Sequence, residues 1–96
     1  MKVTTTTGFK CEVDERVLDD YRLVDSLRKL NSSDEMTMIE GLTTIVDLIL
    51  GKEKERLFKH IMSYSDGFVN KNAMDSETRE IVQALKLKNS GSSQKP

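Results

Sequence analysis

Residues 36–50 read MTMIEGLTTIVDLIL and form the most apolar window of the chain. The side chains that recur at the spacing of one helical face are Ile39, Leu42, Val46 and Ile49. Others fall elsewhere around the same helix, at Ile45, Leu48 and Leu50. A helix that is apolar nearly all round must be covered by other elements. The window therefore predicts a buried central helix, and its length of about 15 residues, interrupted by Glu40 and Asp47, is too short to span a bilayer.

Composition predicts a small single domain without a nucleic-acid or membrane surface. The 96 residues are 36% hydrophobic and 32% charged, with a formal net charge of −1. Acids and bases are interspersed, so no continuous basic stretch is offered to a phosphate backbone or a membrane. Cys11 is the single cysteine, which excludes an intrachain disulfide and favours a reducing compartment. The opening MKVTTTTGFK lacks the apolar run of a signal peptide, so we expect a cytosolic protein.

Residues 2–13 predict a β-hairpin with a turn at Thr7-Gly8. The side chains that alternate with charged residues, as in a strand whose one face packs on helices, are Phe9, Cys11 and Val13. A two-residue turn would place Thr6 opposite Phe9 and Thr4 opposite Cys11, and a longer turn would change that register. The outer edges of a lone hairpin stay open to pairing with another copy.

About four helices are expected after the hairpin, at residues 15–30, 34–50, 52–64, and from Asn70 or Asp75-Ser76 to about Lys86. The expected boundary residues are Asp14 before the first helix, and Ser33 or Asp34 before and Gly51 after the second. The inward-facing residues expected on the first helix are Val17, Tyr21, Val24 and Leu27, flanked by Leu18, Leu23 and Leu30. Those expected on the last two are Leu57, Phe58, Ile61, Met62, Ile81, Val82 and Leu85, with Met74 and Leu87. Phe68 and Val69 are expected to pin the intervening loop to the core.

These elements predict an α+β fold in which an N-terminal β-hairpin packs on a cluster of about four α-helices. Residues 1–87 are expected to form the single domain. Residues 88–96 read KNSGSSQKP, a polar composition that predicts a disordered C-terminal tail.

The side chains indicate no catalytic, metal or cofactor site. His60 is the single histidine and is expected to be a partly exposed helix residue rather than a catalytic base. Cys11 is expected to be a small buried side chain rather than a reactive thiolate. The acids around Asp14 and Asp19-Asp20 suit capping and the helix dipole better than a cation site. The scattered glycines form no phosphate-binding loop.

Two classes of function stay open from the residues alone. One is a protein-binding module that uses its apolar helix faces and hairpin edge, with methionines as adaptable contacts, although core filling is their commoner role. The other is a small helical regulator that binds nucleic acid or another protein. Its basic residues are Arg28, Lys29, Lys52, Lys54, Arg56 and Lys59. Acids lie among them at Asp34, Glu35, Glu53 and Glu55, and their screening favours the first class.

Three segments in order resemble the short tail assembly chaperones of long-tailed phages and prophages of Gram-positive bacteria. They are KVTTTTGFKCEVDERVLDDYRLVDSL at residues 2–27, IVDLILGKEKERLFKHI at residues 45–61 and SDGFVNKNAM at residues 65–74. The closing Leu-Lys-Asn-Ser at residues 87–90 is also similar to the family. The chain departs from the pattern at residues 31–40, NSSDEMTMIE, and at Asn70, where the family commonly has proline.

The resemblance implies an assembly factor rather than an enzyme. Such chaperones bind the tape measure protein before tail tube subunits polymerise around it, act in the bacterial host cytoplasm and are absent from the mature virion. Partners are then the tape measure protein, with the tail tube protein and further copies of the chain as additional candidates, and a longer frameshifted form is common. We expect the hairpin edge and a methionine-bearing helix flank to make these contacts. The candidate partner-binding residues are Val3, Thr5, Met36, Met38 and Met62.

Overall fold

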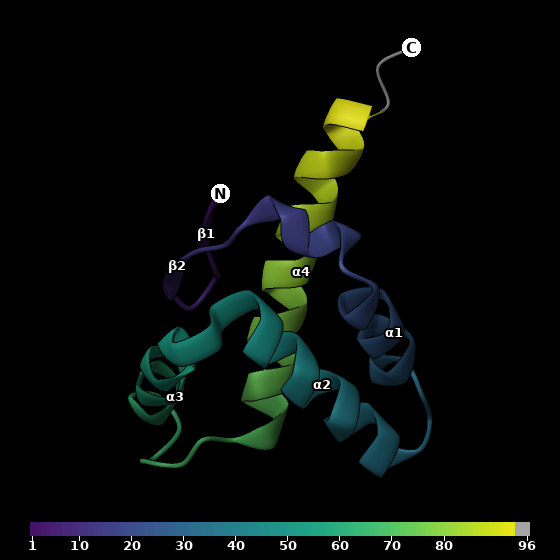
Figure 1. Ribbon diagram of the computed structural model, residues 1–96. Coiled ribbons are helices and arrows are strands. Elements are labelled where there is room, and N and C mark those ends of the chain that lie inside the picture. The colour runs from purple at the N-terminus through teal and green to yellow at the C-terminus, as the bar shows by residue number, and fades with distance from the viewer. Residues whose placement is uncertain (94–96) are drawn as a thin grey trace.

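The computed structural model describes the backbone of residues 1–93 and the side chains of residues 1–87. Its elements are β1 (Lys2–Thr4), β2 (Lys10–Glu12), the 3-10 turn η1 (Glu15–Asp19), α1 (Tyr21–Leu30), α2 (Glu35–Leu50), the 3-10 turn η2 (Gly51–Glu53), α3 (Lys54–Met62) and α4 (Lys71–Ser93). The predicted α+β class and its N-terminal hairpin are confirmed. Helix α4 runs the length of the molecule and projects beyond it, while the other elements pack along its lower part (Figure 1).

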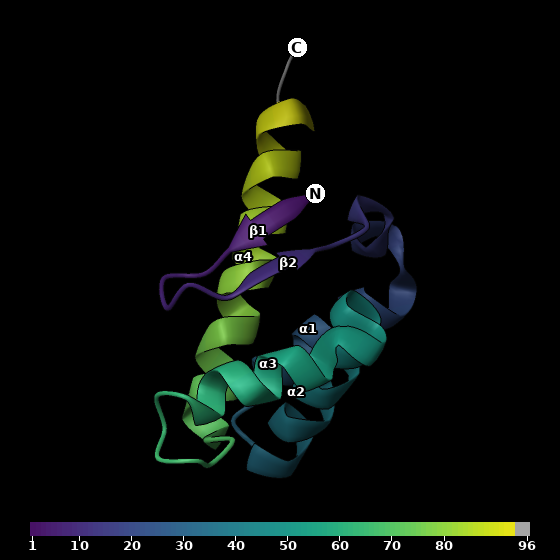
Figure 2. The same ribbon diagram turned by 90° about the vertical axis from the view of Figure 1, so that its left-hand side faces the viewer.

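The hairpin has a three-residue turn, so the register based on a two-residue turn is wrong. Val3 lies opposite Cys11, and Thr4 lies opposite Lys10 rather than Cys11. The Gly8 amide donates to the Thr5 carbonyl (2.9 Å), and the positive φ of Gly8 (96°) closes a turn that a residue with a Cβ adopts only with strain. Phe9, Cys11 and Val13 are buried as predicted, and Figure 2 shows the hairpin lying against α4.

The first predicted helix is split in two at Asp20. Asp14 caps η1 as expected, because its carboxylate accepts from the Arg16 amide (2.9 Å). Asp20 repeats the arrangement at the start of α1, with an extended backbone and a carboxylate that accepts from the Arg22 amide (2.9 Å). Each Asp-x-Arg segment therefore starts its own helix, and the continuous helix expected from residue 15 is wrong.

The split at Asp20 also changes which face of α1 is buried. Tyr21 and Val24, predicted to point inward, are 77% and 51% exposed. Leu23 and Leu30, predicted to flank the inward stripe, are buried together with Ser26, and Leu27 is partly buried as predicted. The centre of the buried face is therefore shifted from Tyr21 and Val24 towards Leu23 and Ser26, because a stripe continued unbroken from Val17 ignores the break at Asp20.

Helix α2 packs on α1 at a point where the two backbones nearly touch. Of the two predicted caps, Ser33 and Asp34, it is Asp34 that begins α2, since its carboxylate accepts from the Thr37 amide (2.9 Å); Gly51 follows the last residue of the helix as predicted. A Cβ added at Gly41 would lie 2.6 Å from the Ser26 carbonyl oxygen and 2.8 Å from the Leu30 nitrogen. Only glycine therefore fits this crossing.

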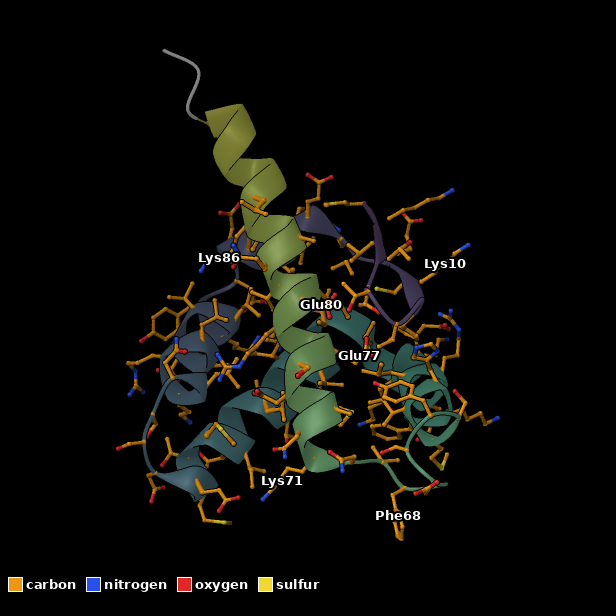
Figure 3. All side chains as sticks on the ribbon, turned by 180° about the vertical axis from the view of Figure 1, so that it is seen from behind. Lys10, Phe68, Lys71, Glu77, Glu80 and Lys86 are labelled. Atoms are coloured by element: carbon orange, nitrogen blue, oxygen red, sulfur yellow. The ribbon has the colours of Figure 1, made fainter. Side chains whose placement is uncertain are left out.

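The loop between α3 and α4 is not pinned by its apolar residues. Phe68 is 71% exposed and Val69 is 39% exposed, so the expectation that they reach the core is wrong. The positive φ angles of Asp66 (52°) and Gly67 (81°) turn the chain sharply there, and in Figure 3 Phe68 points away from the body of the molecule.

Helix α4 begins after Asn70, whose side-chain oxygen accepts from the amides of Asn72 (2.9 Å) and Ala73 (3.1 Å). The core residues predicted on this helix, Ile81, Val82 and Leu85, are buried, whereas Leu87 is 63% exposed. The predicted end near Lys86 is wrong, because the helix continues to Ser93 and no proline interrupts it there. The tail expected at residues 88–96 thus begins inside a helix, and residues 94–96 lie outside the described residues.

Helix α4 also ties the hairpin end of the fold to the α1–α2 end. Arg79 donates to the Leu30 carbonyl (3.0 Å) and the Asn31 side chain (3.2 Å), while Asp75 holds its guanidinium from one turn earlier (2.9 Å). Within residues 1–93, no helix has the length and apolarity that crossing a membrane requires.

Gly41→Ala should lower the free energy of unfolding by about 2–3 kcal/mol. In a helix with no neighbour at that position, Gly→Ala raises stability by about 1 kcal/mol. A lower free energy of unfolding for Gly41→Ala would therefore show that the close contact with the α1 backbone outweighs the gain in helix propensity. Urea denaturation measures the change. Thr43→Ala, on an exposed position of the same helix, is the matched control and should change the value by less than about 0.5 kcal/mol. A Gly41→Ala protein as stable as the parent would show that α1 and α2 can separate freely.

Candidate protein-binding groove

An apolar groove lies between α2, α3 and the first turns of α4. It has a volume of about 290 Å³. Its lining residues are Ile39, Leu42, Thr43, Val46 and Asp47 of α2, Lys54 and Phe58 of α3, and Lys71 and Met74 of α4. Five of these nine residues are apolar, and apolar atoms contribute most of the lining surface, which is the usual make-up of a site that binds an apolar surface.

Two ion pairs border the groove. Lys54 of α3 donates to Asp47 of α2 (2.7 Å), and Lys71 of α4 pairs with Glu35 at the start of α2. The hydrogen bond to Asp47 raises the pKa of Lys54 above its ordinary value. Both pairs are substantially exposed, so each contributes little to stability. Their chief effect is to place charged side chains at the edges of a groove whose central residues are apolar.

Met36 extends the groove wall of α2 into solvent. It lies three residues before Ile39 and seven before Thr43, so the three side chains share one face of the helix. Met36 is 72% exposed, and Phe68, in the loop that joins the other two walls, is nearly as exposed.

The five partner-binding residues predicted from the sequence differ in their exposure to solvent. Val3 and Thr5 are each only 4% exposed, and the Thr5 amide donates to the Phe9 carbonyl (2.9 Å), so their side chains are not available at the hairpin surface. Met38 is partly buried against the core, and Met62 is partly buried at the end of α3. Met36 is the one of the five that is exposed, on the same face of α2 as the groove residues Ile39 and Thr43.

The groove was not predicted, although the apolar pattern of α2 indicates that one side of the helix could form it. Leu42 and Val46 belong to the predicted inward stripe of a helix that is apolar nearly all round. Such a helix needs cover on every side, and this short chain covers only part of it. Partial exposure of Ile39 beside buried Leu42 and Val46 marks the side that the fold leaves open.

A second polar feature joins the hairpin turn to α3 and α4. Glu77 of α4 is 1% exposed, and its Oε2 accepts from the hydroxyl of Tyr64 (2.7 Å) and from that of Thr7. The Thr7 oxygen also lies 2.8 Å from His60 Nε2. One turn further along α4, Glu80 accepts from the Thr6 amide and the Thr6 hydroxyl (both 2.8 Å). Figure 3 shows Glu77 and Glu80 on the side of α4 that faces the hairpin and α3.

The donors of this network can be assigned from proton counts. Thr7 has one hydroxyl proton, and the ionised Glu77 can only accept, so Thr7 donates to Glu77. His60 Nε2 must then be the donor to the Thr7 oxygen. A histidine that donates cannot take the proton of the same hydroxyl, so this arrangement does not activate Thr7 as a nucleophile. The contact instead fastens the hairpin turn to α3.

Burial and hydrogen bonds shift the pKa values of Glu77 and Tyr64 in opposite directions. Burial alone would raise the pKa of Glu77, but the hydroxyls of Thr7, Tyr64 and Thr5 and the nearby His60 together hold that pKa below its ordinary value. Partial desolvation, followed by the hydrogen bond to Glu77, raises the pKa of Tyr64 to about 12. Burial likewise raises the pKa of the Cys11 thiol, which lies on the inner face of strand β2. These shifts stabilise an ionised carboxylate and neutral hydroxyls near neutral pH.

Within the part of the chain that the structure describes, no group of three or more His, Cys, Asp or Glu side chains is placed to hold a metal ion. Comparison of the chain with protein-family models, with curated proteins and with solved structures finds no match.

Glu77→Ala should lower the free energy of unfolding by about 2–4 kcal/mol, because it removes a buried carboxylate that accepts hydrogen bonds from Thr7 and Tyr64. Gln83→Ala, on an exposed face of α4, is the control and should stay within about 0.5 kcal/mol of the parent in the same urea titration. A loss no greater than that of the control would mean that the network does not hold the hairpin.

The Tyr64 hydroxyl should titrate near pH 12 in the folded protein. A Tyr21→Phe background leaves Tyr64 as the single tyrosine, so ultraviolet absorbance follows its ionisation alone. Because the folded pKa lies above the reference value of 10.0, this group stabilises fully below pH 10, and its contribution is lost as pH rises towards about 12. Adding Glu77→Gln should move the midpoint downward. A midpoint near 10 in the Tyr21→Phe protein would contradict the contact with Glu77.

Proposed function

We propose that the protein is a tail assembly chaperone of a long-tailed phage or prophage. It binds the tape measure protein and keeps it soluble until the tail tube polymerises, and it acts in the host cytoplasm without catalysing a reaction. The resemblance of residues 2–27, 45–61 and 65–74 to that family motivates the proposal. The apolar groove between α2, α3 and α4 is the structural observation that supports it.

The dimensions of the groove suit one face of a client helix. Ile39, Leu42 and Val46 line it over two turns of α2, a length of about 10 Å. An amphipathic helix placed there would bury apolar side chains at positions i, i+3, i+4 and i+7. The tape measure protein is a long helical client, so several copies of the chaperone could cover successive stretches of it. A small apolar contact per copy would also let tail tube subunits displace the chaperone.

The alternative of a nucleic-acid-binding regulator gains less support. Most of the basic side chains that such a regulator would use are paired with carboxylates. Arg28 pairs with Asp25, Lys29 with Glu40, Lys54 with Asp47 and Arg56 with Glu53. Pairs of this kind reduce the field that a phosphate backbone would meet. An apolar groove contributes nothing to phosphate binding, whereas it is what a client helix requires.

The test is co-expression with the tape measure protein encoded beside it, followed by size-exclusion chromatography with light scattering. The client should become soluble and co-elute with several copies of the chaperone. Met36→Glu and Thr43→Glu each place a carboxylate on the groove face of α2 and should weaken capture about tenfold or more, because the charge must be desolvated on binding. Both positions are exposed, so the fold should be retained.

Tyr21→Glu is the matched control for these variants. It puts the same charge on an equally exposed apolar position of α1, away from the groove, and should leave capture unchanged. Full capture by both α2 variants at parental stability would remove the groove from the proposal. A client that stays insoluble with the unaltered chain would overturn the chaperone function itself.

A further inference from the structure

Basic side chains gather where the hairpin meets α3. Two neighbouring hollows of about 360 and about 500 Å³ lie there, and both include Lys10 and Arg56 in their lining. Lys2 lines the first hollow, and Lys59 with His60 line the second. We call the set Lys2, Lys10, Arg56 and Lys59 the basic strip.

The basic strip differs from the rest of the surface in its share of lysines that make no ion pair among the described residues, although Arg56 is paired with Glu53. Elsewhere, most described basic side chains are ion-paired, as Arg22 is with Asp20 and Arg79 with Asp75. Among the described residues, Lys2, Lys10 and Lys59 make no ion pair. Two of the acids beside the strip are engaged, since Glu12 binds the N-terminal amino group (3.2 Å) and Glu53 binds Arg56 (2.9 Å). A third, Glu55, lies one helical turn before Lys59 and makes no ion pair among the described residues. A chain of net charge −1 thus carries a local excess of positive charge here, because four basic side chains and the N-terminal amino group lie beside three acids.

Arg56 is held in a fixed position at the centre of the strip. Its guanidinium lies 5.2 Å from the centroid of the Phe9 ring and donates to the Lys10 carbonyl (2.7 Å). Glu53 holds the same group from one turn earlier in the chain. The flexible Lys10 and Lys59 therefore flank an arginine that loses little further freedom on binding an anion.

We propose that the basic strip binds an acidic helical segment of a partner protein. Lys2 and Lys10 are diagonal neighbours across the hairpin, about 7–8 Å apart, and Arg56 and Lys59 are one helical turn apart, about 5–6 Å. Carboxylates three or four residues apart on a helix have a similar spacing of about 5–6 Å. Side chains of Glu or Asp along one face of a helix therefore match the strip in both charge and spacing.

This surface is distinct from the groove. Lys54 and Phe58 face the groove from α3, whereas Arg56, Lys59 and His60 lie on the flank of α3 that faces the hairpin. The inference thus goes beyond the proposed chaperone function and holds whichever protein the groove binds. A short strip interrupted by Glu12 and Glu53 suits a few carboxylates better than a nucleic acid, whose affinity comes largely from many phosphate contacts along the backbone.

The test uses a fluorescent helical peptide of about 18 residues with Glu at every third or fourth position, and a second peptide with Gln in place of each Glu. Fluorescence anisotropy should show binding of the Glu peptide to the full chain, weakening as salt rises from about 0.05 to about 0.2 M, and much weaker binding of the Gln peptide. Lys10→Glu and Lys59→Glu should each weaken binding about fivefold, and together by more than about tenfold.

Lys86→Glu is the matched control. It makes the same change of charge at an exposed lysine on the side of α4 away from Lys10, as Figure 3 shows, and should leave the dissociation constant within about twofold. Equal losses in the control and strip variants would show that net charge alone attracts the peptide. No measurable binding of the Glu peptide, equal binding of the Gln peptide, or tighter binding of a labelled DNA strand than of the Glu peptide would each overturn the inference.

Discussion

The close contact between α1 and α2 at Gly41 positions the elements that form the groove. Because no Cβ separates the backbones there, α1 packs directly on one side of α2, and the small buried Ser26 lies opposite Gly41. The side of α2 that carries Ile39, Leu42 and Val46 is thereby turned towards α3 and α4. A larger residue at position 41 would push α1 outward and rotate or shift α2. The shape of the groove thus depends on a contact on the opposite side of the helix that forms its wall.

Carboxylates of α4 place the hairpin in a comparable way. Glu80 and Glu77 hold the successive threonines Thr6 and Thr7 of the turn, and His60 completes the attachment from α3. An isolated two-stranded hairpin is marginal in water, so this attachment and the burial of apolar side chains beneath it hold the strands in place. The hairpin then lies beside α3, and the two surfaces of α3 acquire different characters, one apolar and one basic.

Local signals in the sequence were sufficient for much of the fold but for little of the site. The caps at Asp14 and Asp34 were predicted because capping depends on residues only two or three positions away. The break at Asp20 was missed although it has the same chemistry, because the apolar periodicity around it suggested an unbroken helix. The contact of Thr7 with Glu77 joins residues 70 positions apart, and no periodicity reports such a contact. The exposure of Phe68 likewise follows from the turn at Asp66-Gly67 rather than from hydrophobicity.

Burial of the single cysteine gives the chain a built-in chemical probe of its own motions. The Cys11 thiol lies on the inner face of the hairpin, where it is 8% exposed, and burial disfavours the reactive thiolate. Because so little of the thiol is exposed, a thiol reagent should react with it much faster once the hairpin lifts from the helices or the whole domain unfolds. Labelling rates under native conditions therefore report the opening of one supersecondary unit, and their dependence on denaturant separates that opening from global unfolding.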